Sequence, residues 1–152
     1  MHFWRKRYDM ESSLKESLLR KFIRLSTEEK KLFAEAVFFI FFSKVFLLLP
    51  FRICLKQLRP AEEMDGRLSA RSLQNIRNAV SRAGKLTFWE NNCLPASLGG
   101  RFMLQRRRVG SVMYLGLQFK NGKELVAHAW LTADNIYVTP KGKTNYKEIF
   151  KV

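Results

Sequence analysis

The chain has 152 residues, of which 47% are hydrophobic, enough to bury the core of one ordinary domain. This composition excludes a chain that is disordered throughout. Its 28 basic and 13 acidic side chains leave a formal charge of +15, which favours polyanions, anionic lipid or acidic peptides without choosing among them. The two cysteines, Cys54 and Cys93, belong to no CxxC pair, and the basic N-terminus lacks the apolar stretch of a secretory signal. We therefore expect a cytoplasmic protein.

The first third of the chain is predicted to be helical. Residues 14–25 carry apolar side chains every three or four positions between basic ones, which indicates a short amphipathic helix. Residues 26–29 (STEE) have the form of a capping box, and we expect a long helix from there to about Leu49. The apolar run 32–51 approaches membrane-spanning length, but two charged residues and a proline interrupt it. A buried or membrane-touching helix is therefore the better interpretation.

The rest of the chain changes from a helical to a strand period. Two further helices are predicted, over residues 69–82 and 94–107, and Cys93 falls at the N-terminal edge of the second. After Gly110 the apolar residues alternate, and an Asn-Gly turn and an Asp-Asn turn separate the strands of an antiparallel meander. These strands are expected at residues 112–119, 124–131 and 136–138.

Together these elements predict an α+β fold. Breaks around Arg59-Pro60 and Asp65-Gly66 place a boundary between an N-terminal helical region, residues 1–65, and the core on which it packs, residues 66–152. Because the N-terminal region is both basic and apolar, we expect it to provide docking surfaces for partners.

Cys93 and His128 are the residues best suited to carry a reaction. A helix N-terminus has free amides and a partial positive charge, which favour a thiolate, so Cys93 is placed to be reactive. His128 lies on a strand one hairpin away, from which an imidazole can reach the neighbouring helix start and act as base, then acid. Taken alone, such a pair is more often structural or incidental. No segment has the spacing of metal ligands or a phosphate-binding loop, so neither metal nor cofactor is expected.

Two further features have two interpretations each. Trp130 lines a peptide cleft or belongs to the core, and we weight the two equally. The three arginines at 106–108 would bind acidic side chains of a partner, although favourable charge at a helix C-terminus is the simpler explanation. Cys54, by contrast, has one expected role, that of a buried small hydrophobic residue.

The surroundings of Cys93 and His128 resemble those in a known family. Four segments in a fixed order carry the resemblance: Asn91-Asn92-Cys93-Leu94-Pro95-Ala96-Ser97-Leu98, Leu104-Gln105-Arg106-Arg107-Arg108-Val109-Gly110, Tyr114-Leu115-Gly116-Leu117 and Ala127-His128-Ala129-Trp130-Leu131. They are similar to motifs of the leader peptidase of lasso-peptide biosynthesis, in its stand-alone, microcin-processing form. The resemblance covers most of residues 20–150. It implies a papain-like, transglutaminase-like core and a cysteine peptidase that removes the leader from a ribosomally made precursor.

Carried over by position, the resemblance implies Cys93 as the nucleophile and His128 as the base. The family's third residue is an aspartate after the histidine strand. Asp134 is the one acidic residue soon after His128, although its place in a turn equally suits a hairpin-capping role. Asn145 is a weaker alternative, because orienting a neutral imidazole requires an acceptor and not necessarily a charge. The Cys93 amide would hold the oxyanion, helped by one of the two preceding asparagines.

The resemblance also implies partners. These are the leader of the precursor peptide, a separate small leader-binding protein and an ATP-dependent lasso cyclase, with peripheral membrane contact as a further expectation. A second class of function stays open, namely a non-catalytic basic module that binds a membrane surface or nucleic acid. Nucleic acid is not the expected partner, because the basic residues are spread along the chain and no known binding motif appears.

Overall fold

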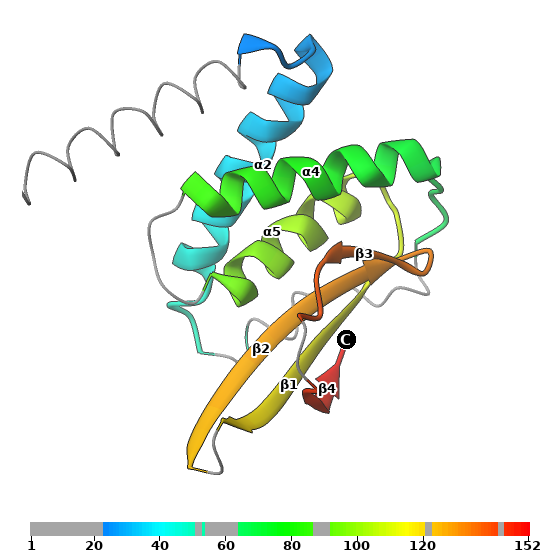
Figure 1. Cartoon of the computed structure of the whole chain (residues 1–152). Helices are drawn as coiled ribbons and strands as arrows, with labels where there is room; N and C mark the ends of the chain where they lie inside the picture. Colours follow the sequence, from blue (N-terminus) through cyan, green and yellow to red (C-terminus); the bar gives the residue numbers. More distant parts are fainter. Residues whose placement is uncertain (1–22, 51–52, 54–63, 87–91, 121–122, 143–144) are drawn as a thin grey trace, which may run out of the picture. The chain divides into compact units, whose positions relative to one another are not determined.

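The structure, a computed structural model, describes residues 23–50, 53, 64–86, 92–120, 123–142 and 145–152. Within these residues the chain forms helices and an antiparallel sheet with the strand order β3-β2-β1-β4 (Figure 1). The elements are α2 (Thr27–Phe46), α4 (Ala70–Leu86), α5 (Cys93–Arg106), β1 (Val112–Lys120), β2 (Glu124–Ala133), β3 (Ile136–Thr139) and β4 (Lys147–Lys151). The predicted α+β fold is confirmed.

The chain divides into two compact units, residues 1–31 and residues 32–152. The larger unit contains α2 from Leu32 onward, the other two helices and the whole sheet. Most of the helix predicted over residues 14–25 lies outside the described residues, and so does Cys54. The larger unit holds everything that positions the candidate site.

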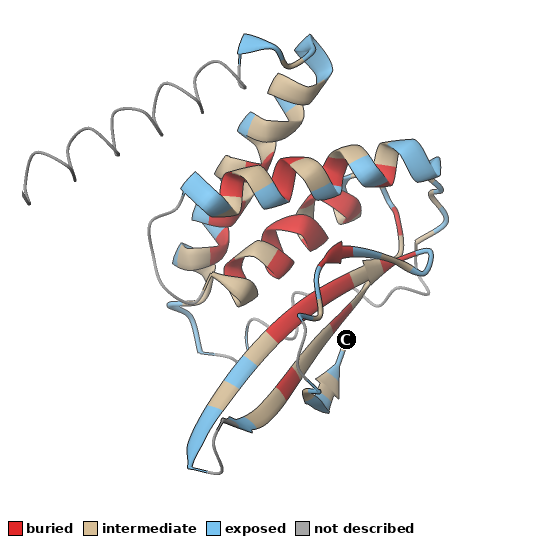
Figure 2. Ribbon diagram, in the orientation of Figure 1, coloured by how far each residue is buried: buried red, intermediate tan, exposed pale blue. Residues whose placement is uncertain are grey.

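In the larger unit, the helices cover one face of the sheet (Figure 1). Consecutive pairs join β1 to β2 without a bulge, from Val112 opposite Thr132 to Lys120 opposite Glu124. Because side chains alternate along a strand, buried Leu131 faces the helices, and its neighbour Trp130 points to the opposite face. Figure 2 shows the buried residues concentrated along α5 and the part of β2 beneath it.

Serine caps start two of the helices. At α2, the Ser26 amide donates to the Glu29 carboxylate at 3.0 Å and the Glu29 amide donates to the Ser26 hydroxyl at 3.2 Å, which is the predicted capping box. At α4, the Ser72 amide donates to the Ser69 hydroxyl at 3.1 Å. Each cap satisfies an amide that the helix itself leaves unbonded.

The phenylalanine-rich helix α2 is partly buried. Ala36 and Ile40 are fully covered by the core, whereas Phe38 and Phe41 are more than 60% exposed. The helix ends at Phe46, three residues before the predicted end. No helix among the described residues combines the length and the apolar character that crossing a membrane requires.

The central helix of the larger unit is α5, and eight of its fourteen residues are buried. A β-carbon at Gly99 would lie 2.9 Å from Ile40 Cγ1 and 3.1 Å from the Ile40 amide nitrogen. A β-carbon at Gly100 would lie 3.0 Å from Leu131 Cδ2. Two adjacent glycines therefore let α2 approach α5 on one side and β2 approach it on the other.

A buried cation anchors α5 to the sheet. Arg101 is fully buried, and its Nη1 donates to the carbonyl oxygen of Ser111 at 3.3 Å and to that of Val152. Val152 in turn pairs with Met113 of β1 through two backbone hydrogen bonds of 2.7 and 3.0 Å. Burial lowers the pKa of Arg101, because a charged group loses solvation in the core. The guanidinium thus ties the helix to the start of β1 and to the segment after β4.

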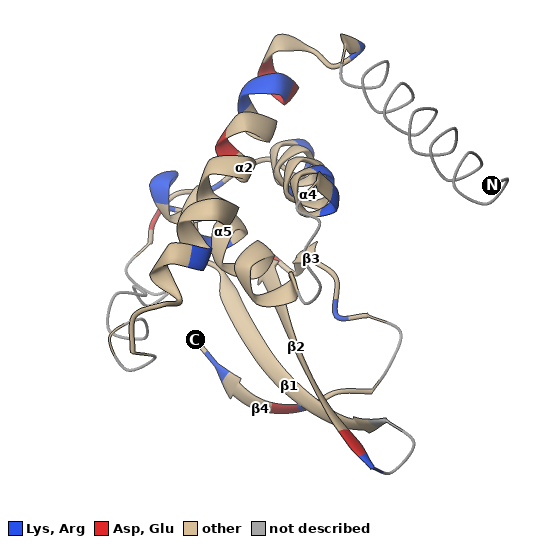
Figure 3. Ribbon diagram, turned by 90° about the vertical axis from the view of Figure 1, so that its left-hand side faces the viewer, with Lys and Arg blue, Asp and Glu red and all other residues tan. Residues whose placement is uncertain are grey.

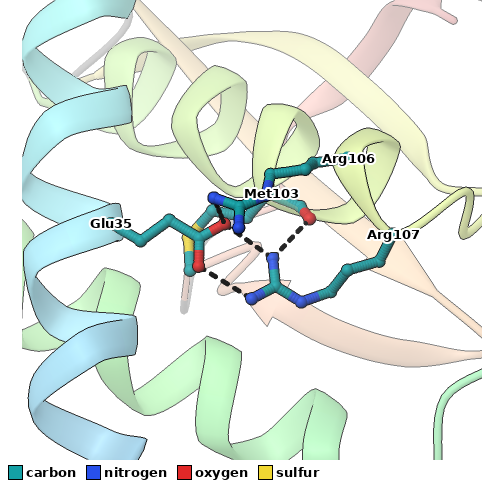
Figure 4. A network of polar contacts seen from close by, with 4 residues as sticks. All are labelled: Glu35, Met103, Arg106 and Arg107. Atoms are coloured by element: carbon teal, nitrogen blue, oxygen red, sulfur yellow. Dashed lines mark hydrogen bonds and ion pairs between the residues drawn. The ribbon is translucent and has the colours of Figure 1, made fainter.

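An ion-pair network joins the C-terminal end of α5 to α2 (Figure 4). Arg107 makes a bidentate contact with Glu35, with both N···O distances 2.7 Å, and also donates to the Met103 carbonyl at 2.8 Å. Arg106 adds a longer contact of 3.4 Å to the same carboxylate. The hydrogen bond with Glu35 raises the pKa of Arg107, and the charge of Glu35 acts in the same direction against the effect of burial. These arginines therefore bind an acidic residue of their own chain.

The segment around the predicted boundary is fixed to the end of α5. Gly66 pairs in parallel with Val109, and its amide donates to the Arg108 carbonyl at 2.8 Å. A β-carbon at Gly66 would lie 2.5 Å from the Arg107 carbonyl oxygen, so a larger residue does not fit. The predicted division at residues 65 and 66 thus falls on a segment that contacts the core.

The glycine contact between α5 and α2 can be tested by substitution. We expect Gly99→Ala to lower the free energy of unfolding by about 1–3 kcal/mol, because the new methyl group overlaps Ile40. Gly84→Ala is the matched control, since nothing lies within 4 Å of its β-carbon position in α4. The control should stabilise by about 0.5–1 kcal/mol through helix propensity. Urea denaturation followed by circular dichroism measures both, and equal effects of the two variants would contradict the close approach.

A second prediction concerns the ion pair. Glu35→Ala leaves the largely buried guanidinium of Arg107 without its carboxylate, and we expect a loss of about 1.5–3 kcal/mol of unfolding free energy. Arg106→Ala removes the partner that is 67% exposed and should change stability by no more than about 0.5 kcal/mol. Thermal and urea denaturation compare the two. A larger effect from Arg106→Ala would show that the bidentate pair is not the main link.

Candidate active site

Cys93 is the first residue of α5, and its thiol is free and partly buried. The first bond of the helix runs from the Ala96 amide to the Asn92 carbonyl at 2.9 Å, and the Asn92 side chain does not cap the helix. Within the first turn, Pro95 has no amide, and the amides of Cys93 and Leu94 have no acceptor inside the helix. The helix start thus offers donors and a partial positive charge beside the thiol.

His128 lies in the middle of β2, and a main-chain oxygen holds its ring. Nε2 is 2.9 Å from the carbonyl oxygen of Pro140, which directly follows β3. A carbonyl only accepts, so Nε2 is the donor in this hydrogen bond. In the neutral ring Nδ1 then carries the lone pair. The Pro140 carbonyl therefore selects the tautomer in which Nδ1 is the base.

Aromatic residues surround the imidazole. The ring of Tyr146 stacks on His128 with centroids 4.9 Å apart, and the ring of Trp130 lies 6.1 Å away. Trp130 is buried, stacks on Tyr114 at 5.4 Å and is covered by the Lys141 ammonium at 5.1 Å. Trp130 therefore packs beside His128 on the same face of the sheet, and because it is buried it does not line an open cleft.

Glycine makes room for this aromatic cluster. A β-carbon at Gly116 would lie 2.8 Å from Tyr146 Cβ and 2.9 Å from the Trp130 ring. Gly116 is directly opposite His128 in the pairing of β1 with β2. The glycine of the Tyr114 to Leu117 motif thus leaves room for Tyr146 and for the Trp130 ring next to the imidazole.

A polar contact connects the start of α5 to the segment that holds His128. The hydroxyl of Ser97, one helical turn after Cys93, lies 2.8 Å from Thr139 Oγ1, and both residues are buried. Thr139 Oγ1 also accepts from the Leu131 amide of β2 at 2.8 Å. Because Pro140 follows Thr139, the N-terminal turn of α5 runs alongside the residues that orient the imidazole.

Cys93 begins the helix whose Ser97 contacts Thr139, and His128 contacts the next residue, Pro140. His128 lies on the sheet face of Trp130, opposite the face on which Leu131 meets α5. No hydrogen bond joins the Cys93 thiol to His128, both of which the structure describes. Without substrate, catalytic hydrogen bonds are often long or incomplete.

The structure places Asp134 away from the imidazole. Asp134 and Asn135 form the turn between β2 and β3, with φ values of 47° and 62°. Asp134 is six residues along the chain from His128, roughly 20 Å in an extended strand. Asn145 is exposed, and Asn91 lies outside the described residues. Where a carboxylate was expected, the structure has the main-chain carbonyl of Pro140, which no side-chain pattern could have indicated.

Comparison with known proteins identifies the family. A model of the transglutaminase-like superfamily matches residues 36–151, which include both Cys93 and His128. The chain belongs to the transglutaminase-like superfamily. Domains of this superfamily are often cysteine-type enzymes, peptidases among them. Neither the curated proteins nor the solved structures contain a match to the chain.

Thiol reactivity tests whether the two residues act together. In a Cys54→Ala background, we expect iodoacetamide to alkylate Cys93, and His128→Ala to slow that alkylation by about tenfold or more at neutral pH, because the base is lost. Asp134→Asn is the matched control and should leave the rate unchanged, since Asp134 lies in the far turn. Mass spectrometry over time gives the rates. If Asp134→Asn slowed the alkylation of Cys93 and His128→Ala did not, the assignment of His128 as the residue that activates the thiol would be wrong.

Proposed function

We propose that this chain is a cysteine peptidase that cleaves the leader from a lasso-peptide precursor. The observation that carries the proposal is the placement of Cys93 at the N-terminus of the buried helix α5, whose Ser97 contacts Thr139, the residue before the carbonyl that orients His128. Membership of the transglutaminase-like superfamily supports a cysteine-type enzyme. The four motifs around these residues support the narrower role in leader removal.

The geometry suits hydrolysis through an acyl-enzyme. His128 Nδ1 takes the proton of the Cys93 thiol, and the thiolate attacks the carbonyl carbon of the scissile amide. The oxyanion that forms can accept hydrogen bonds from the Cys93 and Leu94 amides at the helix start. The protonated imidazole then gives its proton to the leaving amine, and a water molecule, deprotonated by His128, hydrolyses the thioester. No cofactor enters this scheme.

Substrate delivery is proposed to involve partners in the cytoplasm. A separate small protein would bind the leader, and an ATP-dependent cyclase would receive the freed core peptide. Among the described residues, Lys and Arg occur on several elements, α4, α5 and β4 among them (Figure 3), and the charge of +15 offers general attraction to an acidic peptide. The exposed side chains Phe38 and Phe41 of α2 are the best candidates for contact with one of these partners.

The same phenylalanines support the second candidate, a module that binds a membrane surface. Aromatic side chains beside basic residues are typical of peripheral membrane contact. Flotation with vesicles of anionic lipid separates the candidates, because membrane binding by a non-catalytic module would be unaffected by Cys93→Ala.

The decisive test is cleavage of a precursor. A candidate lasso-peptide precursor from the same gene neighbourhood is incubated with the protein and a small leader-binding protein, and mass spectrometry follows the products. We expect cleavage at one site, reduced at least about 100-fold in Cys93→Ala and in His128→Ala. Cys54→Ala serves as the control and should cleave at the wild-type rate. Absence of cleavage by folded wild-type protein with bound leader would refute the peptidase.

A further inference from the structure

The strand that carries His128 has a long open edge. β2 has ten residues, but β3 pairs only with its last part, Leu131–Ala133. On its other side β1 pairs with β2 from Glu124 to Thr132. Among the residues that the structure describes, none pairs with the outer edge of β2 between Glu124 and Trp130. The catalytic histidine thus sits on a strand with unused main-chain groups.

The pairing shows which main-chain groups point outward. The Leu131 amide donates to Thr139 Oγ1 of β3, so it points away from β1. The direction of these groups alternates along a strand, and no bulge interrupts the pairing with β1. The amides and carbonyls of Ala129 and Ala127 therefore point to the open edge. They flank His128 on both sides.

This edge lacks the protection that open strand edges usually have. Edge strands commonly carry charged residues that discourage pairing with another chain. β4, at the other side of the sheet, has lysines at both ends and Glu148 between them. The stretch 125–130 (LVAHAW) has no charged residue. Of the two edges, the one beside the histidine is open to pairing.

We propose that this edge binds the substrate, and that the extended segment around the scissile bond adds to the sheet as a strand beside Ala127 and Ala129. The inference rests on the proposed function. Main-chain pairing of this kind supplies affinity and leaves side-chain pockets to supply specificity. The edge ends at Thr139 and Pro140, which contact Ser97 of α5 and His128. A peptide on this edge therefore lies between the helix start and the imidazole.

A proline substitution tests the edge in the protein. Ala127 is exposed and its amide faces outward, so Ala127→Pro removes one donor while the pairing with β1 remains. With the precursor peptide as probe, we expect kcat/KM to fall about tenfold or more. Ala127→Val keeps the amide and should lose much less, which separates the amide from the side chain. The iodoacetamide alkylation rate of Cys93 should stay within about twofold of wild type in the proline variant, which shows an intact site.

A backbone scan of the peptide gives an independent measurement with wild-type protein. Precursor peptides carrying one N-methylated amide at successive positions around the scissile bond are compared. We expect methylation to lower kcat/KM at alternate residues of the peptide, because only every second amide of an added strand points to β2. At each such position kcat/KM should fall about fivefold to tenfold, since one lost hydrogen bond contributes modestly. Equal effects at consecutive positions, or none at all, would overturn the inference.

The outcomes separate this inference from the proposed function. If wild-type protein cleaves no precursor, the proposed function fails and this inference fails with it. If Ala127→Pro and the methylated peptides are cleaved like their parents, the edge inference alone is overturned and the peptidase stands. If Ala127→Pro instead converts a dimer to a monomer in gel filtration, a second copy of the chain occupies the edge, which also overturns the inference.

Discussion

The arrangement of the larger unit depends on the close approach that two glycines allow. Gly99 admits α2 on one side of α5 and Gly100 admits β2 on the other, so the helix is enclosed by apolar contacts. A helix held on two sides cannot slide along the sheet without losing both contacts. Packing contacts more than one helical turn away therefore set the position of Cys93 at the start of this helix. The Arg101 guanidinium adds a polar anchor in the same helix.

Thr139 links this packing to the chemistry. Its hydroxyl oxygen meets Ser97 of α5 and the Leu131 amide of β2, where the regular pairing with β3 ends. The next residue, Pro140, cannot continue a ladder as a donor, and its carbonyl turns to His128. Termination of β3 thus produces both the acceptor for the imidazole and the open stretch of β2. One short strand end explains two features of the site.

Much of the fold could be predicted from the sequence, because the apolar residues of its elements recur with a clear helical or strand period and because capping and turn residues mark where the elements end. The capping box, the helix after Cys93 and the strands on either side of the Asn-Gly turn were predicted within a few residues. β4 was missed, because five residues with lysines at both ends have no apolar alternation and pair with β1 around a bulge. Burial of Arg101 was missed because arginine normally indicates a surface. The acceptor for His128 belongs to the main chain, which any residue can supply.

A main-chain acceptor changes how the site can stabilise charge. A carboxylate would both orient the imidazole and neutralise its positive form, whereas the Pro140 carbonyl orients it through a dipole. In the proposed reaction, the imidazolium of His128 would instead meet the face of Tyr146, whose ring centroid is 4.9 Å away, and an aromatic face attracts a cation at that range. A Cys93 thiolate would meet the positive end of α5. In the proposed reaction, each of the two charges would thus be supported by a separate neutral group, without a third ionised residue.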